Sequence, residues 1–146
     1  NFEARTGGYP EELKPKRRLK NFKLKYSRML TCHSMLMYLL AIFNEKQTVS
    51  VDDAISAVKL TPTGRVEALA IHPGASKAHR ELSGLLDLYD SFLQLTAGRE
   101  DEALVHFKDK HTAKPLMEQA EAFGDAIARA LHLMGDGTRL YRLMIV

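Results

Sequence analysis

The sequence predicts an all-α fold, a single compact bundle of about six helices with a long N-terminal helix and no sheet. Two observations predict it. Apolar residues recur at intervals of three and four through each long segment, which is the period of one helix face. Capping residues, Pro and Gly separate these segments at regular points. With 146 residues, 45% of them apolar, the chain is one domain long and can bury one core. We expect an irregular arm over residues 1–15 and one helical domain over residues 16–146.

The first expected helix runs from about residue 16 to residue 44. Its apolar face follows the helical period: Leu19, Phe22, Tyr26, Met29, Leu30, His33, Met37 and Leu40. The second half of this helix is apolar nearly all round, which predicts burial on several sides. Its lysines lie in the first half, where we expect them on the solvated face.

Two short helices are expected next. Ser50 is a good N-cap for a helix over residues 51–59, because its hydroxyl can accept a free amide of the first turn. Thr61 caps the following helix, and Pro62 stands at its first position, where the missing N–H costs no hydrogen bond. This second helix is expected to end near Ile71.

The rest of the chain reads as three further helices. Ser76 is expected to cap a helix that ends near Ala97, and an acidic first turn opens a shorter helix over residues 100–111. Pro115 is expected to open the last long helix, which Gly135 ends. Residues 139–146 are apolar, and we expect them to dock on the core.

Charge is distributed unevenly along the chain. Residues 1–43 hold nine Lys/Arg and three Glu, a net charge of +6, whereas residues 44–146 have a net charge of −3. A basic amphipathic helix of this kind is typical of contact with DNA, RNA or an anionic protein. The candidate phosphate-binding residues in it are Lys14, Lys16, Arg17, Arg18, Lys20, Lys23 and Lys25.

Several classes of function are disfavoured. The single cysteine, Cys32, excludes an internal disulfide and a multi-cysteine zinc site, and its apolar surroundings predict a buried thiol in a reducing, cytoplasmic compartment. The apolar run over residues 29–43 is shorter than the ~20 residues that span a bilayer, so no membrane role is expected. No ligand spacing for a metal and no Gly-rich phosphate loop is present, so we expect neither metal nor cofactor.

Residues 50–69 resemble a helix-turn-helix, with two short helices, small residues inside and Pro near the start of the second helix. The resemblance implies that Thr61, Thr63 and Arg65 face DNA. The segment departs from the pattern in having Lys59 where Gly is common and a net charge of −1. Two ordinary helices are the alternative interpretation.

Arg28 and His33, five residues apart, resemble the ribonuclease motif of the HEPN helical family, although Met29 follows the Arg where that family often has a polar residue. The resemblance implies that His33 acts on a ribose 2′-hydroxyl and that Arg28 steadies the phosphate. Because His33 falls on the apolar helix face, a hydrogen-bonded core histidine is the alternative interpretation.

The leading hypothesis is therefore a non-catalytic helical domain that contacts DNA or RNA through its basic helix and the element at residues 50–69. A second hypothesis is an accessory domain that packs on a protein partner or on another domain of its parent chain, for example a nucleotide-handling one. The start at Asn1 and the apolar C-terminus motivate it. A HEPN-like ribonuclease is the third. The apolar face over residues 29–43 also allows a homodimer.

Overall fold

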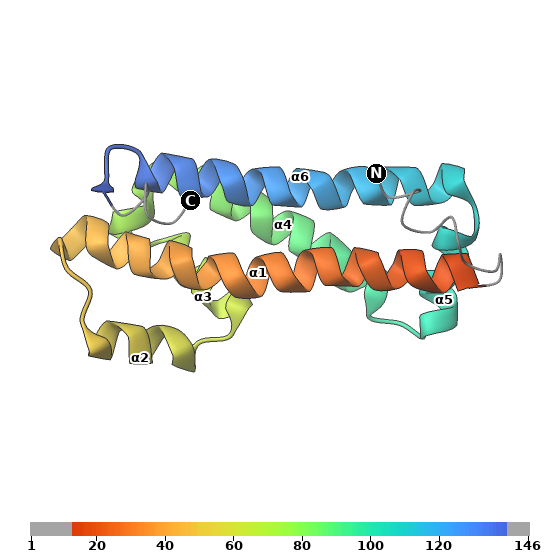
Figure 1. Cartoon of the computed structure of the whole chain (residues 1–146), viewed down its shortest axis with the longest axis horizontal. Coiled ribbons are helices and arrows are strands. Elements are labelled where there is room, and N and C mark those ends of the chain that lie inside the picture. Colours follow the sequence, from red (N-terminus) through yellow and green to blue (C-terminus); the bar gives the residue numbers. More distant parts are fainter. Residues whose placement is uncertain (1–12, 140–146) are drawn as a thin grey trace.

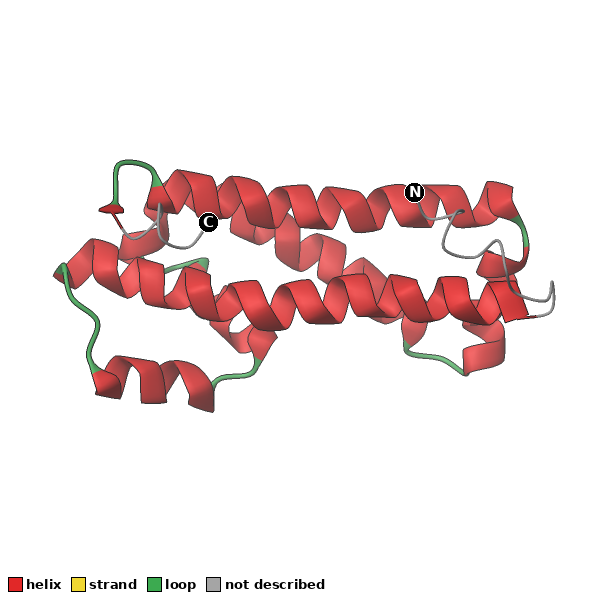
Figure 2. Cartoon of the chain, viewed as in Figure 1, coloured by secondary structure: helices red, strands yellow, loops and turns green. Residues whose placement is uncertain are grey.

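The computed structural model describes residues 13–139. Within this range, six α-helices and one 3-10 helix follow one another and no strand occurs, which confirms the all-α prediction (Figure 2). They are α1 (Lys14–Lys46), α2 (Val51–Lys59), α3 (Pro62–Leu69), η2 (Pro73–Ala78), α4 (His79–Thr96), α5 (Glu100–Lys108) and α6 (Lys110–Gly135).

Helix α1 is the spine of the bundle. Its 33 residues extend about 50 Å. Helix α6 runs alongside it, α4 crosses behind the pair, α5 packs at the N-terminal end of α1, and α2 lies along the other half (Figure 1). Pro15 stands in the first turn of α1, where its missing N–H costs nothing, and Gln47 ends the helix in a left-handed conformation at φ 60°. The expected helix was therefore correct in type and two residues too short at each end, and Lys14 and Pro15 are helical rather than irregular.

An aromatic cluster fills the middle of the bundle and joins four helices. Tyr26 of α1 stacks on Phe92 of α4 at 4.3 Å between ring centroids and meets Phe123 of α6 at 4.6 Å. Phe22 packs at 5.2 Å on Phe107 of α5. All five rings are buried. Offset and tilted ring pairs at these distances add to the free energy of area burial, so the cluster sets the relative positions of these four helices.

The apolar second half of α1 is enclosed from several directions, as its composition predicts. Helices α2, α3, η2 and α6 all pack against it. At Gly74 of η2 the approach is so close that a β-carbon would overlap the carbonyl oxygen of Ala41. The expectation that Cys32 is buried was wrong, because its side of α1 is left uncovered and the thiol is exposed.

Both predicted caps of the short helices are confirmed. The Oγ of Ser50 accepts the Asp53 N–H at 3.1 Å, and the Asp53 carboxylate accepts the Ser50 N–H at 2.9 Å, which is a complete capping box. The Oγ1 of Thr61 accepts the Gly64 N–H at 3.0 Å, with Pro62 at the first position of α3. The sequence therefore places α2 and α3 correctly.

Helix boundaries in the second half of the chain differ from the predictions. Ser76 lies inside η2 and α4 begins at His79 without a side-chain cap. Helix α5 ends at Lys108, because Asp109 caps a new helix by accepting the His111 N–H at 3.0 Å. Helix α6 therefore begins five residues before Pro115 and runs through it. The proline is exposed there, and the helical bond it removes is the one to the exposed residue His111.

No helix of residues 13–139 combines the length and hydropathy that crossing a bilayer requires. The expectations for the arm before residue 13 and for a docked segment after residue 139 concern parts of the chain outside the described residues.

Candidate nucleic-acid interface

The first half of α1 carries the basic candidates, and the structure divides them into two groups. Lys16, Lys20 and Lys23 follow the spacing i, i+4, i+7 and so share one sector of the helix surface over about 10 Å. Lys16 and Lys20 are exposed and Lys23 is half-buried. None of the three has an ion-pair or hydrogen-bond partner within residues 13–139. We call these three residues the lysine row.

The other basic candidates of α1 are already engaged. Nη1 of Arg18 donates to the carbonyl oxygen of Phe107 at 3.2 Å, and the side chain is buried against α5. Nζ of Lys25 lies 3.7 Å from a carboxylate oxygen of Glu121 on α6. Lys14 and Arg17 also have interaction partners. Arg18, a candidate phosphate-binding residue, is therefore enclosed by the packing of α5 on α1.

The structure does not expose Arg65, which the helix-turn-helix interpretation expects to face DNA. Arg65 is only 8% exposed and points into the bundle. Its Nε donates to the carbonyl oxygen of Ala57 at 2.7 Å, and its Nη1 donates to the Oγ of Ser34 at 3.2 Å. The side chain thus holds α3 to α1 and to the end of α2 instead of facing a nucleic acid.

The two threonines of that element do lie toward solvent. Thr61 is exposed and Thr63 is half-buried, and their hydroxyl oxygens lie 3.2 Å apart. The charged side chain that α3 exposes is Glu67, which would repel phosphate. Helix α3 packs against both α1 and α4, so it is part of the core. A DNA contact by Thr61 and Thr63 stays a prediction, without an exposed cation on α3 to support it.

Arg28 and His33 are not brought together within the chain. Five residues on a helix correspond to a rotation of about 140°, so their side chains leave α1 on different sides. Arg28 is exposed, whereas His33 is half-buried and its Nδ1 donates to the Met29 carbonyl oxygen at 2.9 Å. The alternative interpretation is therefore confirmed for the hydrogen bond, but His33 is half-buried and not a core residue.

A polar junction that the sequence analysis missed joins the far ends of α1 and α6. Nδ2 of Asn44 donates to the carbonyl oxygens of Gly74 and Met134 at 3.0 and 2.8 Å. Beside it lies a cavity of about 300 Å³, lined by Asn44, Gly74, Met134 and Asp136 among others. Both amide hydrogens of Asn44 are already used to hold the three elements together, so the junction reads as structural. The signal for this junction in the sequence was a single Asn directly after the apolar run of residues 29–43.

His72 extends this junction. Its Nδ1 accepts the Gly74 N–H at 3.0 Å, so its Nε2 carries the proton and faces Glu45 at 3.3 Å. The contact orients the loop before η2. Among residues 13–139, no three His, Cys, Asp or Glu side chains come together in a way that could hold a metal ion.

No protein-family model matches the chain, and no curated protein or solved structure matches it significantly.

Proposed function

We propose that this helical domain contacts the phosphate backbone of a nucleic acid through the lysine row, Lys16, Lys20 and Lys23. The observation that carries the proposal is that these three ammonium groups share one face of α1 and have no counter-charge within the described residues. Unpaired lysines at helical spacing are point charges that release counterions when they meet phosphates.

The surface chemistry favours backbone contact over base reading. Every Phe and Tyr within residues 13–139 is buried or half-buried, so the described surface offers no exposed ring on which a base could stack. Arg65, the arginine of the element at residues 50–69, is used inside the bundle and is not available for bidentate base contacts. Binding is therefore proposed to be independent of sequence, and the element at residues 50–69 contributes orientation at most through Thr61 and Thr63.

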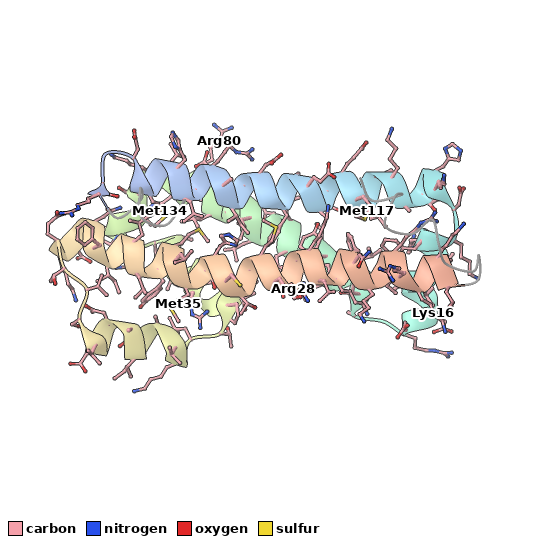
Figure 3. The ribbon with its side chains drawn as sticks, in the orientation of Figure 1. Lys16, Arg28, Met35, Arg80, Met117 and Met134 are labelled. Carbon is pink, nitrogen blue, oxygen red and sulfur yellow. The ribbon has the colours of Figure 1, made fainter. Side chains whose placement is uncertain are left out.

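The test compares two triple variants that lose the same charge. The first variant replaces Lys16, Lys20 and Lys23 by Gln. The control replaces Lys77, Arg80 and Arg129, three exposed cations on η2, α4 and α6, by Gln. Arg80 and Lys16 lie on opposite sides of the molecule in the view of Figure 3.

Fluorescence anisotropy with labelled duplex DNA, duplex RNA and single-stranded DNA at low salt provides the measurement. We expect the lysine-row variant to bind more than about tenfold more weakly than the control variant, since it loses three phosphate contacts. Equal affinities of the two variants would show that only net charge matters. Absence of binding by the unmodified chain to all three probes would overturn the proposal and point to an anionic protein partner.

A further inference from the structure

Helix α2 carries its large apolar side chains on the outside. Val51, Ile55 and Val58 are 76%, 47% and 65% exposed, and their spacing of i, i+4, i+7 places them on one stripe. The buried residue of α2 is the small Ala57. An amphipathic helix normally turns its Val and Ile toward the core. The stripe formed by Val51, Ile55 and Val58 is therefore an apolar face without a partner among the described residues.

Polar contacts on the inner face of α2 attach it to α1 and α3 with this stripe outward. Nζ of Lys46 lies 3.1 Å from the Asp53 carboxylate, which is itself held in the capping box with Ser50. At the other end of α2, the Ala57 carbonyl oxygen accepts the Nε of Arg65 at 2.7 Å. Both ends of α2 are thus attached through the inner face, which is consistent with the outward direction of the stripe. In Figure 1, α2 forms the lower edge of the molecule, with α1 on its other side.

The charges beside the stripe are complementary to those of a second copy of this chain. Asp52 and Lys59 are seven residues apart, so they lie on the same edge of α2, one at each end. Both are exposed, and neither has an ion-pair or hydrogen-bond partner within residues 13–139. In an antiparallel pair of identical helices related by a two-fold axis, each edge faces the same edge of the other copy. Asp52 of one copy then faces Lys59 of the second copy, and the reverse pair forms at the other end.

We propose that the stripe is the contact of a homodimer in which two α2 helices pack antiparallel. Ile55 lies on the two-fold axis against Ile55 of the second copy, and Val51 packs against Val58 of that copy. One register satisfies both the apolar pairs and the Asp52–Lys59 pairs. The antiparallel arrangement also places the positive N-terminal end of each helix dipole beside the negative end of the other. Because α2 has only nine residues, the interface is at the small end of specific contacts and dimerises weakly.

Sedimentation equilibrium from micromolar to millimolar concentration tests the proposal with the full chain. We expect the average mass of the unmodified protein to rise toward twice that of one chain. Ile55→Lys places two like charges at the axis and should weaken association more than about tenfold. Val105→Lys is the matched control, since Val105 is 58% exposed on α5, away from the stripe, and should dimerise as the unmodified protein does.

Charge exchange tests the antiparallel register. Asp52→Lys alone and Lys59→Asp alone each create like-charge pairs and should weaken the dimer. The double variant Asp52→Lys/Lys59→Asp restores the opposite-charge pairs and should recover association, with circular dichroism checking that α2 stays helical. A mass that stays monomeric at millimolar concentration, or dimerisation unaffected by Ile55→Lys, overturns the dimer. Dimerisation that the double variant fails to recover overturns the antiparallel register. Because nucleic acid is absent from these experiments, their outcome is independent of the lysine row.

Discussion

The Nη1 of Arg65 lies 3.2 Å from the Oγ of Ser34, which connects the second turn of α3 to the middle of α1 inside the bundle. No carboxylate pairs with this guanidinium within the described residues. Its charge is instead met by two neutral oxygens, those of Ser34 and of the Ala57 carbonyl. Arg65, which the sequence pattern assigns to DNA recognition, thus links α3 to α1 and α2 inside the bundle.

Replacing Arg65 by Met should therefore destabilise the fold without a specific loss of binding. The variant loses two hydrogen bonds from a charged donor and leaves the Ala57 carbonyl oxygen without its side-chain donor, so we expect a loss of about 1.5–3 kcal/mol in the free energy of unfolding. Urea titration measures it, and Arg80→Met, at an exposed position, should change stability by less than about 0.5 kcal/mol.

The same variant distinguishes the two roles of Arg65. At a temperature where Arg65→Met is still folded, its affinity for duplex DNA should match that of the unmodified chain. A large loss of affinity in a fully folded variant would restore the helix-turn-helix interpretation.

Removing the hydroxyl of Tyr26 should stabilise the fold. The ring is fully buried in the aromatic cluster and its hydroxyl has no hydrogen-bond partner within residues 13–139. Tyr26→Phe keeps the ring contacts and removes a buried unpaired donor, so we expect a gain of about 1 kcal/mol at neutral pH. Tyr89→Phe, a change in a half-buried ring of the same cluster, serves as the control and should be close to neutral.

The burial of Tyr26 should also make the stability of the fold sensitive to alkali. Burial raises the pKa of its phenol from 10.0 to about 12. Since the unfolded chain releases this proton first, the free energy of unfolding should fall between about pH 10 and pH 12, and Tyr26→Phe should lack that part of the decline. Identical alkaline profiles of the two proteins would contradict this account of Tyr26.

Asp53 should stabilise the fold in a pH-dependent way. Hydrogen bonds from the backbone N–H and the hydroxyl of Ser50, together with Lys46, lower the pKa of its carboxyl from 3.8 to about 2. The stabilisation is complete above about pH 5 and is lost as the pH falls toward 2, because the unfolded chain takes up the proton first. The difference in unfolding free energy between the unmodified chain and Asp53→Asn should therefore shrink over that window. A difference that stays constant with pH would mean that the charge of Asp53 is irrelevant.

The sequence predicted most helices because their signals are local. The capping groups of Ser50 and Thr61 lie within three residues of the amides they bind, so α2 and α3 could be placed from the chain alone. The boundary between α5 and α6 could not be placed in this way. Both Asp109 and Pro115 can begin a helix, and which of them does so depends on how the two helices pack. The same limit explains why Ser76 was wrongly predicted to be a helix cap. It lies inside η2, whose position depends on the close approach of Gly74 to α1.

The candidate site was predictable in part. The concentration of lysines on α1 is visible in the sequence, but which of them are free depends on distant partners, such as Phe107 for Arg18 and Glu121 for Lys25. The direction of Arg65 and the outward stripe of α2 depend on tertiary packing. A helical period shows which residues share a face, but it does not show which face of a short helix packs against its neighbours.

The salt dependence of duplex binding tests the central claim most directly. The slope of log affinity against log salt counts phosphate contacts, at about 0.9 per contact on duplex DNA. If Lys16, Lys20 and Lys23 each neutralise one phosphate, the lysine-row variant should have a slope shallower by about 2.7 than the unmodified chain, and the Lys77/Arg80/Arg129 control should keep its slope. Equal slopes for the unmodified chain and the lysine-row variant would contradict the assignment of the row as the phosphate-binding surface.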